Sequence, residues 1–286
     1  MEFYLTALIL GLCLSAMSLG IFISMTIFKI PDITTDGSYT LGAVITAVLL
    51  TAHWNAIAII PVVLISGAIA GTLTGLIHTR LKIDALLAGI LVMTGLYSVN
   101  LTILGRSNVP LLNVTTIFSS LQLFAGAVYN NVIISVIFIT IILLIVGYVL
   151  RTDFGIAMRA TGNSKSMTRA LGINNNKMKI IGLAIANSLT ALSGYLVAQY
   201  QNFSDINMGI GIVITGLGSV LIGEALIKWW NITSVAMSLV VVLSGSILFQ
   251  LVLAFTLSIG IDPNMLKLVT AAFVLLIVII PRLKKK

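Results

Sequence analysis

Two acidic side chains, Asp36 and Glu224, lie beside apolar stretches of a 286-residue chain that has only eight acids. A charged side chain at the centre of a bilayer costs about 2.5 to 3.5 kcal/mol on insertion scales, so acids near membrane depth are candidates for function. Asp36 directly precedes Gly37, and it could shape a broken helix that lines a solute path. Glu224 could line the same path, or it could simply pair with Lys228 one helical turn later.

Glycines and polar residues beside these acids complete a candidate path. The stretch TTDGSYTLGA, 34 to 43, and the stretch DINMGIGI, which begins at 205, each stand just before an apolar run. Gly-interrupted apolar segments at matching places in two halves of a chain indicate the substrate site of many transporters. The alternative for the first stretch is an ordinary interfacial turn with Ser38 or Asp36 as the helix N-cap. By position alone, the predicted path is lined by Asp36, Gly37, Ser38, Tyr39, Asn207, Met208, Gly209 and Glu224.

Clustered catalytic or metal-binding side chains are not visible in the sequence. Cys13 stands alone inside the first apolar run, and His53 and His78 are far apart, so a disulfide or a Cys/His metal site is disfavoured. The chain also lacks the motif G-x-x-x-x-G-K followed by Ser or Thr, so it has no loop of its own to cradle ATP phosphates. We therefore expect no catalytic residue, no metal and no bound cofactor on this chain.

The composition places most of this chain in lipid rather than in water. Only 8% of the residues are charged, against roughly a quarter in soluble domains, while 59% are hydrophobic and the mean hydropathy is +1.15. The apolar runs reach the roughly 20 residues that a spanning helix needs, and they show no period-2 alternation, which disfavours a β-barrel. We predict an all-α, polytopic helical membrane protein with about eight to ten transmembrane helices in one domain, residues 1 to 286.

Long helices are predicted wherever an apolar run is bounded by charged or turn-forming residues. The third of them carries Gly67, Gly71 and Gly75 at four-residue spacing, a stripe that lets another helix pack closely. The expected helices cover about 3 to 28, a second from near 37 to His53, 56 to 79, 84 to 105, 126 to 150, 180 to 200, a seventh from near 209 to 224, 231 to 256 and 265 to 281.

Positive charges at the ends of these runs predict the topology, and they account for the net charge of +8 without a nucleic acid partner. The basic tail after 281, the turn at 80 to 82, Lys228 and a basic segment at 151 to 179 fall on the cytoplasmic side. The N-terminus falls outside if the second helix spans fully. The first and sixth helices then run in opposite directions, as an inverted repeat requires, with the two Gly-containing stretches at matching places.

The basic segment 151 to 179 is the most highly charged part of the chain. It holds six of the sixteen Lys and Arg residues and one acid, Asp153. The triplet Gly-Asn-Ser before 165 offers an N-cap and Gly172 offers a stop, so a short helix is predicted over roughly 164 to 171.

This short helix is expected to be amphipathic. Met167, Ala170 and Leu171 share one face at the spacing i, i+3 and i+4, while Lys165 and Arg169 lie elsewhere. Such a helix could rest on anionic lipid, or it could dock into a groove of another protein.

The same segment resembles part of a known transporter family. Its sequence RTDFGIAMRATGNSKSMTRALGI, followed by an apolar helix rich in small residues, is similar to the permease subunits of ABC importers for branched-chain amino acids and ribose. The stretch PDITTDGSYTLGA is similar to the start of that family's second helix, and the resemblance covers nearly the whole chain. Gly223-Glu224 stands where the family often has two glycines, and GIVITGLGSVLIGEAL resembles a subgroup linked with aromatic amino acids such as tryptophan and tyrosine, or with unassigned ligands.

The resemblance implies that the basic segment is a cytoplasmic coupling loop whose helix sits in a cleft of an ATPase subunit. It also implies three partners in a bacterial cell membrane: ABC ATPase subunits that bind ATP and Mg, an extracytoplasmic solute-binding protein, and a second permease copy. The residues then expected to contact the ATPase are Arg159, Gly162, Asn163, Ser164, Met167, Arg169, Ala170, Leu171, Gly172 and Ile173.

Three functions remain open on the sequence. The first is an ABC importer permease that forms the path of an amino acid, aromatic or branched-chain, or of a similar small solute. The second is an ion-coupled secondary transporter, which needs a buried acid such as Asp36 or Glu224 to couple protonation to transport. The third is an integral membrane enzyme, which needs clustered catalytic residues at one membrane interface.

Overall fold

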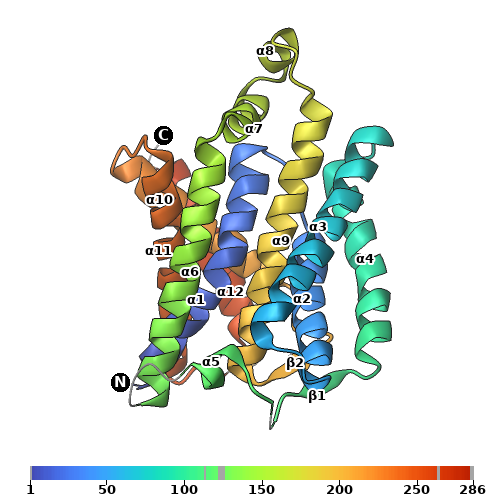
Figure 1. Ribbon diagram of the computed structural model, residues 1–286. Coiled ribbons are helices and arrows are strands. Elements are labelled where there is room, and N and C mark those ends of the chain that lie inside the picture. Colours follow the sequence, from blue (N-terminus) through green and yellow to red (C-terminus); the bar gives the residue numbers. More distant parts are fainter. Residues whose placement is uncertain (1, 113, 122–125, 263–264, 284–286) are drawn as a thin grey trace.

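The computed structural model describes residues 2–112, 114–121, 126–262 and 265–283, and it shows an almost entirely helical protein (Figure 1). Seven helices in this part of the chain are long and apolar enough to cross a membrane, which confirms the predicted fold class, and α2 and α12 have 18 residues each. In chain order the elements are α1 (Glu2–Ile21), the π-helix η1 (Phe22–Ile27), α2 (Thr34–Thr51), α3 (Ala56–Arg80), α4 (Ala85–Leu104), β1 (Asn108–Pro110), α5 (Ile117–Ser120), α6 (Ala127–Arg151), α7 (Asp153–Asn163), α8 (Lys165–Ala170), α9 (Asn175–Gln201), β2 (Phe203–Asp205), α10 (Ile212–Trp229), α11 (Val235–Ser258) and α12 (Leu266–Leu283).

The two ends of the helical bundle carry different parts of the chain. α7 and α8 protrude beyond the long helices at one end, whereas α5, β1, β2 and the start of α1 lie at the other (Figure 1). β1 and β2 pair antiparallel, with Asn108 opposite Asp205. The end of α3 lies at the α7 end, because His78 contacts Lys179 near the start of α9. This distribution of the connections is the one expected from the positive-inside rule.

α1 and α9 form the centre of the bundle and are buried over most of their length. They run antiparallel. Gly20 packs on Ala186, and Ser193, further along α9, donates a hydrogen bond of 2.8 Å to the Cys13 carbonyl. α2, α3, α6, α10 and α11 pack against this pair, whereas α4 packs on α2 and α3, and α12 packs on α10.

The glycine stripe of α3 faces α9. A Cβ atom at Gly71 would collide with the Leu183 carbonyl, and Gly67 and Gly75 approach the backbone of α9 almost as closely. Helix association in lipid depends on close packing of small residues, because lipid tails are as apolar as the side chains themselves. The stripe therefore sets how closely α3 packs against the central helix.

α2 begins at Thr34 and continues without a break, so the predicted broken start is wrong. Both predicted N-caps are also wrong, because Asp36 and Ser38 lie inside the helix. Instead, Asp32 Oδ1 accepts a hydrogen bond of 2.9 Å from the Thr34 N–H. Asp commonly bonds the backbone N–H two residues later, and the sequence offers several such side chains in a row. The irregular backbone occupies residues 28–33, directly after the widened turns of η1.

The basic segment 151 to 179 forms two helices rather than one. The predicted helix is α8, with Ser164 as its N-cap and Gly172 in a left-handed conformation after it. α7 was not predicted, although Thr152 caps it by accepting a bond from the Gly155 N–H. Glycine inside a polar segment usually indicates a loop, and here it occurs within a helix instead.

The predicted helix boundaries are shifted most at three places. α9 begins at Asn175, because Asn174 accepts a bond from the backbone of the first turn and so caps the helix earlier than expected. α10 continues past Glu224 to Trp229, and α11 begins at Val235.

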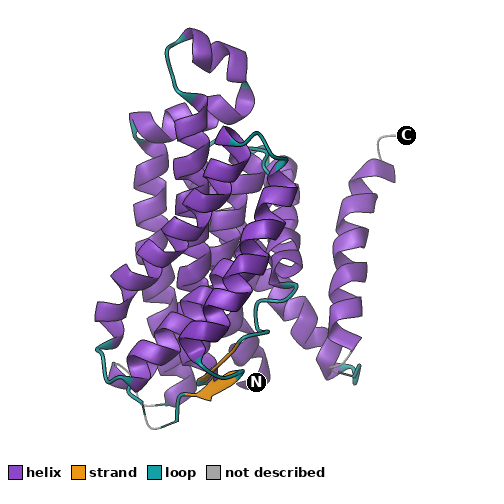
Figure 2. Ribbon diagram, turned by 90° about the vertical axis from the view of Figure 1, so that its right-hand side faces the viewer, coloured by secondary structure: helices purple, strands orange, loops and turns teal. Residues whose placement is uncertain are grey.

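Helix packing recurs in the two halves of the bundle. α9 contacts α2 and α3, and α1 correspondingly contacts α10 and α11. α2 also contacts α3 and α4, while α10 contacts α11 and α12. α12, which leads to the C-terminus, lies at the edge of the bundle (Figure 2). Because α1 and α9 are antiparallel, this recurrence is what an inverted repeat predicts.

Candidate functional site

A buried hydrogen-bond network lies where the chain enters α2. Asp32 Oδ2 accepts a bond of 2.7 Å from Asn187 Nδ2, and Asn187 Oδ1 accepts one of 2.7 Å from Ser38 Oγ. Burial raises the pKa of the Asp32 carboxyl, while hydrogen bonds from Thr34 and Asn187 oppose that rise. One Asp32 oxygen binds Thr34 at the start of α2 and the other binds Asn187 of α9, so the network joins these two helices.

Asp36 connects the two halves of the bundle. Its Oδ2 accepts a bond of 2.8 Å from the Gly211 N–H, and its Oδ1 accepts one of 2.8 Å from the Val213 N–H. These donors lie at the start of α10, whose N-cap residue is Gly211 and therefore has no side chain to cap the helix. The first N–H groups of a helix lack partners within it and carry partial positive charge, which favours a carboxylate. Asp36 thus caps α10 from α2.

A pocket of about 380 Å³ lies between α2, α4 and the turn before α10. Three residues of the predicted path line it, namely Asp36, Gly37 and Gly209, and they are joined by Thr40, Tyr97 and Asn100. Gly209 approaches α2 so closely that a Cβ atom would collide with the Asp36 carbonyl and the Thr40 hydroxyl. The two matching stretches, 34 to 43 inside α2 and the one that begins at 205 before α10, therefore meet in one place.

Asn100 supplies an unused hydrogen-bond acceptor beside this pocket. The residue is 1% exposed, and its Nδ2 donates a bond of 3.2 Å to the Gly37 carbonyl. Its Oδ1 is buried and has no hydrogen-bond partner in the described part of the chain. Leaving a buried acceptor unpaired costs about 1 to 3 kcal/mol. Asn100 was not among the predicted residues, although an amide inside an apolar run was a signal that could have found it.

Four other residues of the predicted path, Ser38, Tyr39, Asn207 and Met208, do not line this pocket. Ser38 and Tyr39 are buried on the opposite side of α2, where they pack toward α9 and the core. The Asn207 N–H donates a bond of 2.7 Å to Asp205 Oδ1 in a turn, and Met208 packs against the core. A helix has 3.6 residues per turn, so neighbouring positions cannot all face one pocket.

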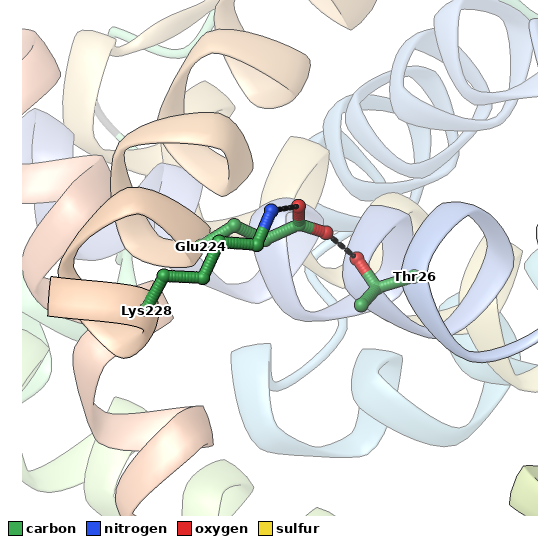
Figure 3. A network of polar contacts seen from close by, with 3 residues as sticks. All are labelled: Thr26, Glu224 and Lys228. Atoms are coloured by element: carbon green, nitrogen blue, oxygen red, sulfur yellow. Dashed lines mark hydrogen bonds and ion pairs between the residues drawn. The ribbon is translucent and has the colours of Figure 1, made fainter. Parts of the chain in front are cut away.

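Glu224 lies about three helical turns along α10 from the Asp36 contact. Its Oε1 accepts a bond of 2.6 Å from Thr26 Oγ1 of η1, and its Oε2 lies 3.6 Å from Lys228 Nζ (Figure 3). The Lys228 side chain is 78% exposed, so solvent weakens this ion pair and the bond to Thr26 is the stronger restraint.

Among the described residues, no group of three or more His, Cys, Asp or Glu side chains is arranged to hold a metal ion.

α8 presents apolar side chains at the protruding end of the protein. Met167 is 62% exposed and Leu171 is 67% exposed. On its other side, Thr168 Oγ1 donates a bond of 2.7 Å to Asn175 Oδ1, and Asn175 Nδ2 donates one of 2.8 Å to the Lys165 carbonyl. These bonds fasten α8 to the start of α9 and leave its apolar side chains on the surface.

The remaining residues predicted to contact a partner differ in exposure. Gly162 packs against η1, where a Cβ atom would collide with the Ile27 carbonyl. Arg159 Nε is buried without a hydrogen-bond partner in the described part of the chain. Ser164 and Ile173 are half-buried, whereas the exposed positions are Asn163, Arg169, Ala170 and Gly172.

Known proteins resemble this chain over most of its length. A family model described as the permease component of the branched-chain amino acid transport system matches residues 3–279. A tyrosine transport system permease protein of Clostridioides difficile is 39% identical over 265 residues, which are 93% of this chain and 86% of that protein. An uncharacterized protein of Rickettsia prowazekii is 35% identical over 271 residues, 94% of each chain. The ribose import permease protein RbsC of Haemophilus influenzae is 26% identical over 197 residues, 67% of this chain and 59% of that protein. No solved structure matches the chain.

Proposed function

Because this chain belongs to the family of permease components of branched-chain amino acid transport systems, we propose that it imports an amino acid with energy supplied by a separate ATPase. The chain is a permease component of an ABC-type transport system and a multi-pass protein of the bacterial plasma membrane. In this transporter, ABC ATPase subunits bind ATP and Mg, and an extracytoplasmic solute-binding protein captures the solute. A second permease copy completes the path.

The exposed surface of α8 is the observation that carries the coupling to an ATPase. Met167 and Leu171 are large apolar side chains held in solvent by a capped helix that is fastened to α9. An amphipathic helix that lays its apolar face into a groove is a common mode of protein recognition. α7 and α8 together would transmit movement of the ATPase to η1 and α9, which they contact.

The pocket beside Asp36 supports an amino acid as the solute. Its volume of about 380 Å³ lies at the lower end of the range for small-molecule sites. The Asp36 carboxylate and the unpaired Asn100 Oδ1 are acceptors suited to an ammonium group, and Tyr97 and Ile210 offer apolar surface to a side chain. The tyrosine transport permease among the relatives is consistent with an aromatic side chain.

Co-purification with the ATPase tests the coupling. In the double variant Met167→Asp and Leu171→Asp, we expect the ATPase to be lost while the permease remains in the membrane fraction. The matched control is Lys177→Asp, an exposed substitution in the first turn of α9. Retention of the ATPase by the double variant would contradict the assignment of α8.

Uptake into proteoliposomes tests the solute and the energy source. The permease is reconstituted with its ATPase and solute-binding protein, and uptake of labelled tyrosine, tryptophan, leucine and ribose is compared. We expect uptake of an amino acid that requires ATP hydrolysis. Uptake driven by an ion gradient without ATP would instead support a secondary transporter.

A further inference from the structure

A second large pocket, at the α7 end of the bundle, is lined by basic side chains. It has a volume of about 710 Å³ and lies between residues 28–31, the turn from α3 to α4, the junction of α7 and α8, and the start of α9. Lys29, Lys165, Lys179 and His78 reach it from four different parts of the chain. It shares no lining residue with the pocket between α2 and α4.

The three lysines of this basic pocket outnumber its one lining carboxylate, that of Asp84, so the pocket keeps a net positive charge. None of its three lysines forms an ion pair with a carboxylate in the described part of the chain. Asp84, the acid at its edge, uses Oδ1 to cap α4 by accepting a bond of 2.9 Å from the Leu86 N–H. Lys165 and Lys179 also repel each other. Like charges gathered in a concave site produce a potential that attracts anions.

Lys179 has a fixed position in the basic pocket. Its Nζ lies 3.3 Å from His78 Nε2, and His78 Nδ1 lies 2.9 Å from the Ile83 carbonyl. Both contacts are satisfied when the imidazole is neutral, donates from Nδ1 to Ile83 and accepts at Nε2 from Lys179. The imidazole therefore orients the ammonium group without cancelling its charge, and the other two N–H donors of Lys179 can serve a ligand.

Lys29 is positioned by an unusual backbone conformation. Its φ of 56° is in the left-handed region, which is strained for a residue other than glycine. The next residue, Ile30, donates a backbone bond of 2.9 Å to the Ser24 carbonyl, which anchors the connection to η1. Strained residues of this kind cluster at functional sites.

We propose that the basic pocket binds a phosphate group, carried by the headgroup of an anionic lipid or by a small soluble phosphate. The three ammonium groups supply charge-assisted bonds to phosphate oxygens, and Ser166 and Asn163 supply neutral donors. Basic pockets between transmembrane helices on the cytoplasmic side are a known type of headgroup site. The ligand contacts four parts of the chain, so its binding stabilises the arrangement of α7 and α8 against α9.

The experiment compares two variants of the full-length permease that lose the same charge. The pocket variant replaces the three lysines of the pocket by Gln: Lys29, Lys165 and Lys179. The control replaces three exposed basic residues of the same end by Gln: Arg80, Lys82 and Lys177. If the triple pocket variant fails to fold, Lys165→Gln, an exposed position on α8, takes its place.

The thermal unfolding midpoint is measured in three environments. They are nanodiscs of zwitterionic phosphatidylcholine, nanodiscs that also contain phosphatidylglycerol, and phosphatidylcholine nanodiscs with inorganic phosphate at constant ionic strength. We expect phosphatidylglycerol to raise the midpoint of the unmodified protein and of the control, and the pocket variant to lose at least half of that rise. A rise with inorganic phosphate that only the pocket variant loses identifies a soluble phosphate as the ligand.

Two results would overturn the proposal. One is an equal rise in the pocket variant and the control, which places the effect of anions elsewhere on the surface. The other is no rise with either phosphate source. If the pocket variant then also fails to co-purify with the ATPase while the control succeeds, the basic pocket is a contact for an acidic surface of that ATPase.

Discussion

The Asp36 carboxylate is at once a cap for α10 and part of the pocket between α2 and α4. Each carboxylate oxygen can accept more than one hydrogen bond, so capping leaves capacity for a bound solute. The sequence indicated Asp36 because an acid near membrane depth costs free energy, and such residues usually have a function. Its partners, Gly211 and Val213, could not be predicted, because they come from a distant part of the chain.

Replacing Asp36 by Asn tests both roles. The amide keeps one acceptor but presents an NH2 group to the other backbone N–H, so one of the two bonds to α10 is lost. We expect the free energy of unfolding to fall by about 1 to 3 kcal/mol, and uptake to fall with it. Thermal unfolding and proteoliposome uptake measure the two effects, with the exposed Asp153→Asn as control. Unchanged stability would show that the carboxylate does not hold α10.

Replacing Asn100 by Leu separates binding from stability. The substitution removes an unpaired buried acceptor, whose presence is unfavourable, together with the bond from Nδ2 to the Gly37 carbonyl, and it keeps a similar volume in α4. We expect stability within about 1 kcal/mol of the original protein and a clear loss of solute uptake. Val99→Leu, at an exposed position of the same helix, is the control. Normal uptake by the Asn100 variant would remove this amide from the solute path.

At the scale of elements, the long helices were predictable because apolar runs, charges and turn residues bound them. The short helix α8 was also predictable from its Ser164 cap and its Gly172 stop. α7 and the start of α2 were not, because in both places several polar or glycine residues follow one another and local rules allow more than one choice. The contacts of η1 and α9 decide between those choices.

The packing of α3 on α9 can be tested with two glycines that differ only in their surroundings. Gly71→Val drives a side chain into the backbone of α9 at Leu183, whereas a Cβ atom at Gly95 on α4 has no atom within 4 Å. Overpacking costs about 1 to 3 kcal/mol and sometimes more, so we expect a large fall in the unfolding midpoint for Gly71→Val only. Similar midpoints for the two variants would contradict the close approach of α3 and α9.

At the scale of the whole molecule, pattern and resemblance predicted the class of protein, and only the structure could place the pockets. The basic pocket draws residues from positions 28 to 179, and no local pattern in the sequence brings those positions together. The recurrence of helix contacts is likewise a property of the bundle. The two matching stretches, one inside α2 and one before α10, suggested it, and they meet where Gly209 contacts Asp36 and Thr40.

The orientation of the molecule can be measured with single cysteines. Cys13 is buried and is the one cysteine of the sequence, so Cys13→Ala provides a background without thiols. In intact cells we expect a membrane-impermeant maleimide to label Asn207→Cys, in the turn before α10, and not Ser166→Cys on α8. Permeabilised cells should label both positions, which is the control for reactivity. The reverse pattern in intact cells would invert the topology.

The bonds between Asp36 and the start of α10 also have a consequence for biosynthesis. Asp36 and Gly211 are separated by 175 positions, so α2 is made long before its hydrogen-bond donors exist. At a synthesis rate of about 5 to 20 residues per second, this interval lasts roughly 9 to 35 s. During that time the carboxylate has to remain hydrated or protonated, because an unpaired charge in lipid is costly. The final placement of α2 in the membrane therefore follows the synthesis of the start of α10, and the N-terminal half cannot complete its fold before Gly211 and Val213 have been made.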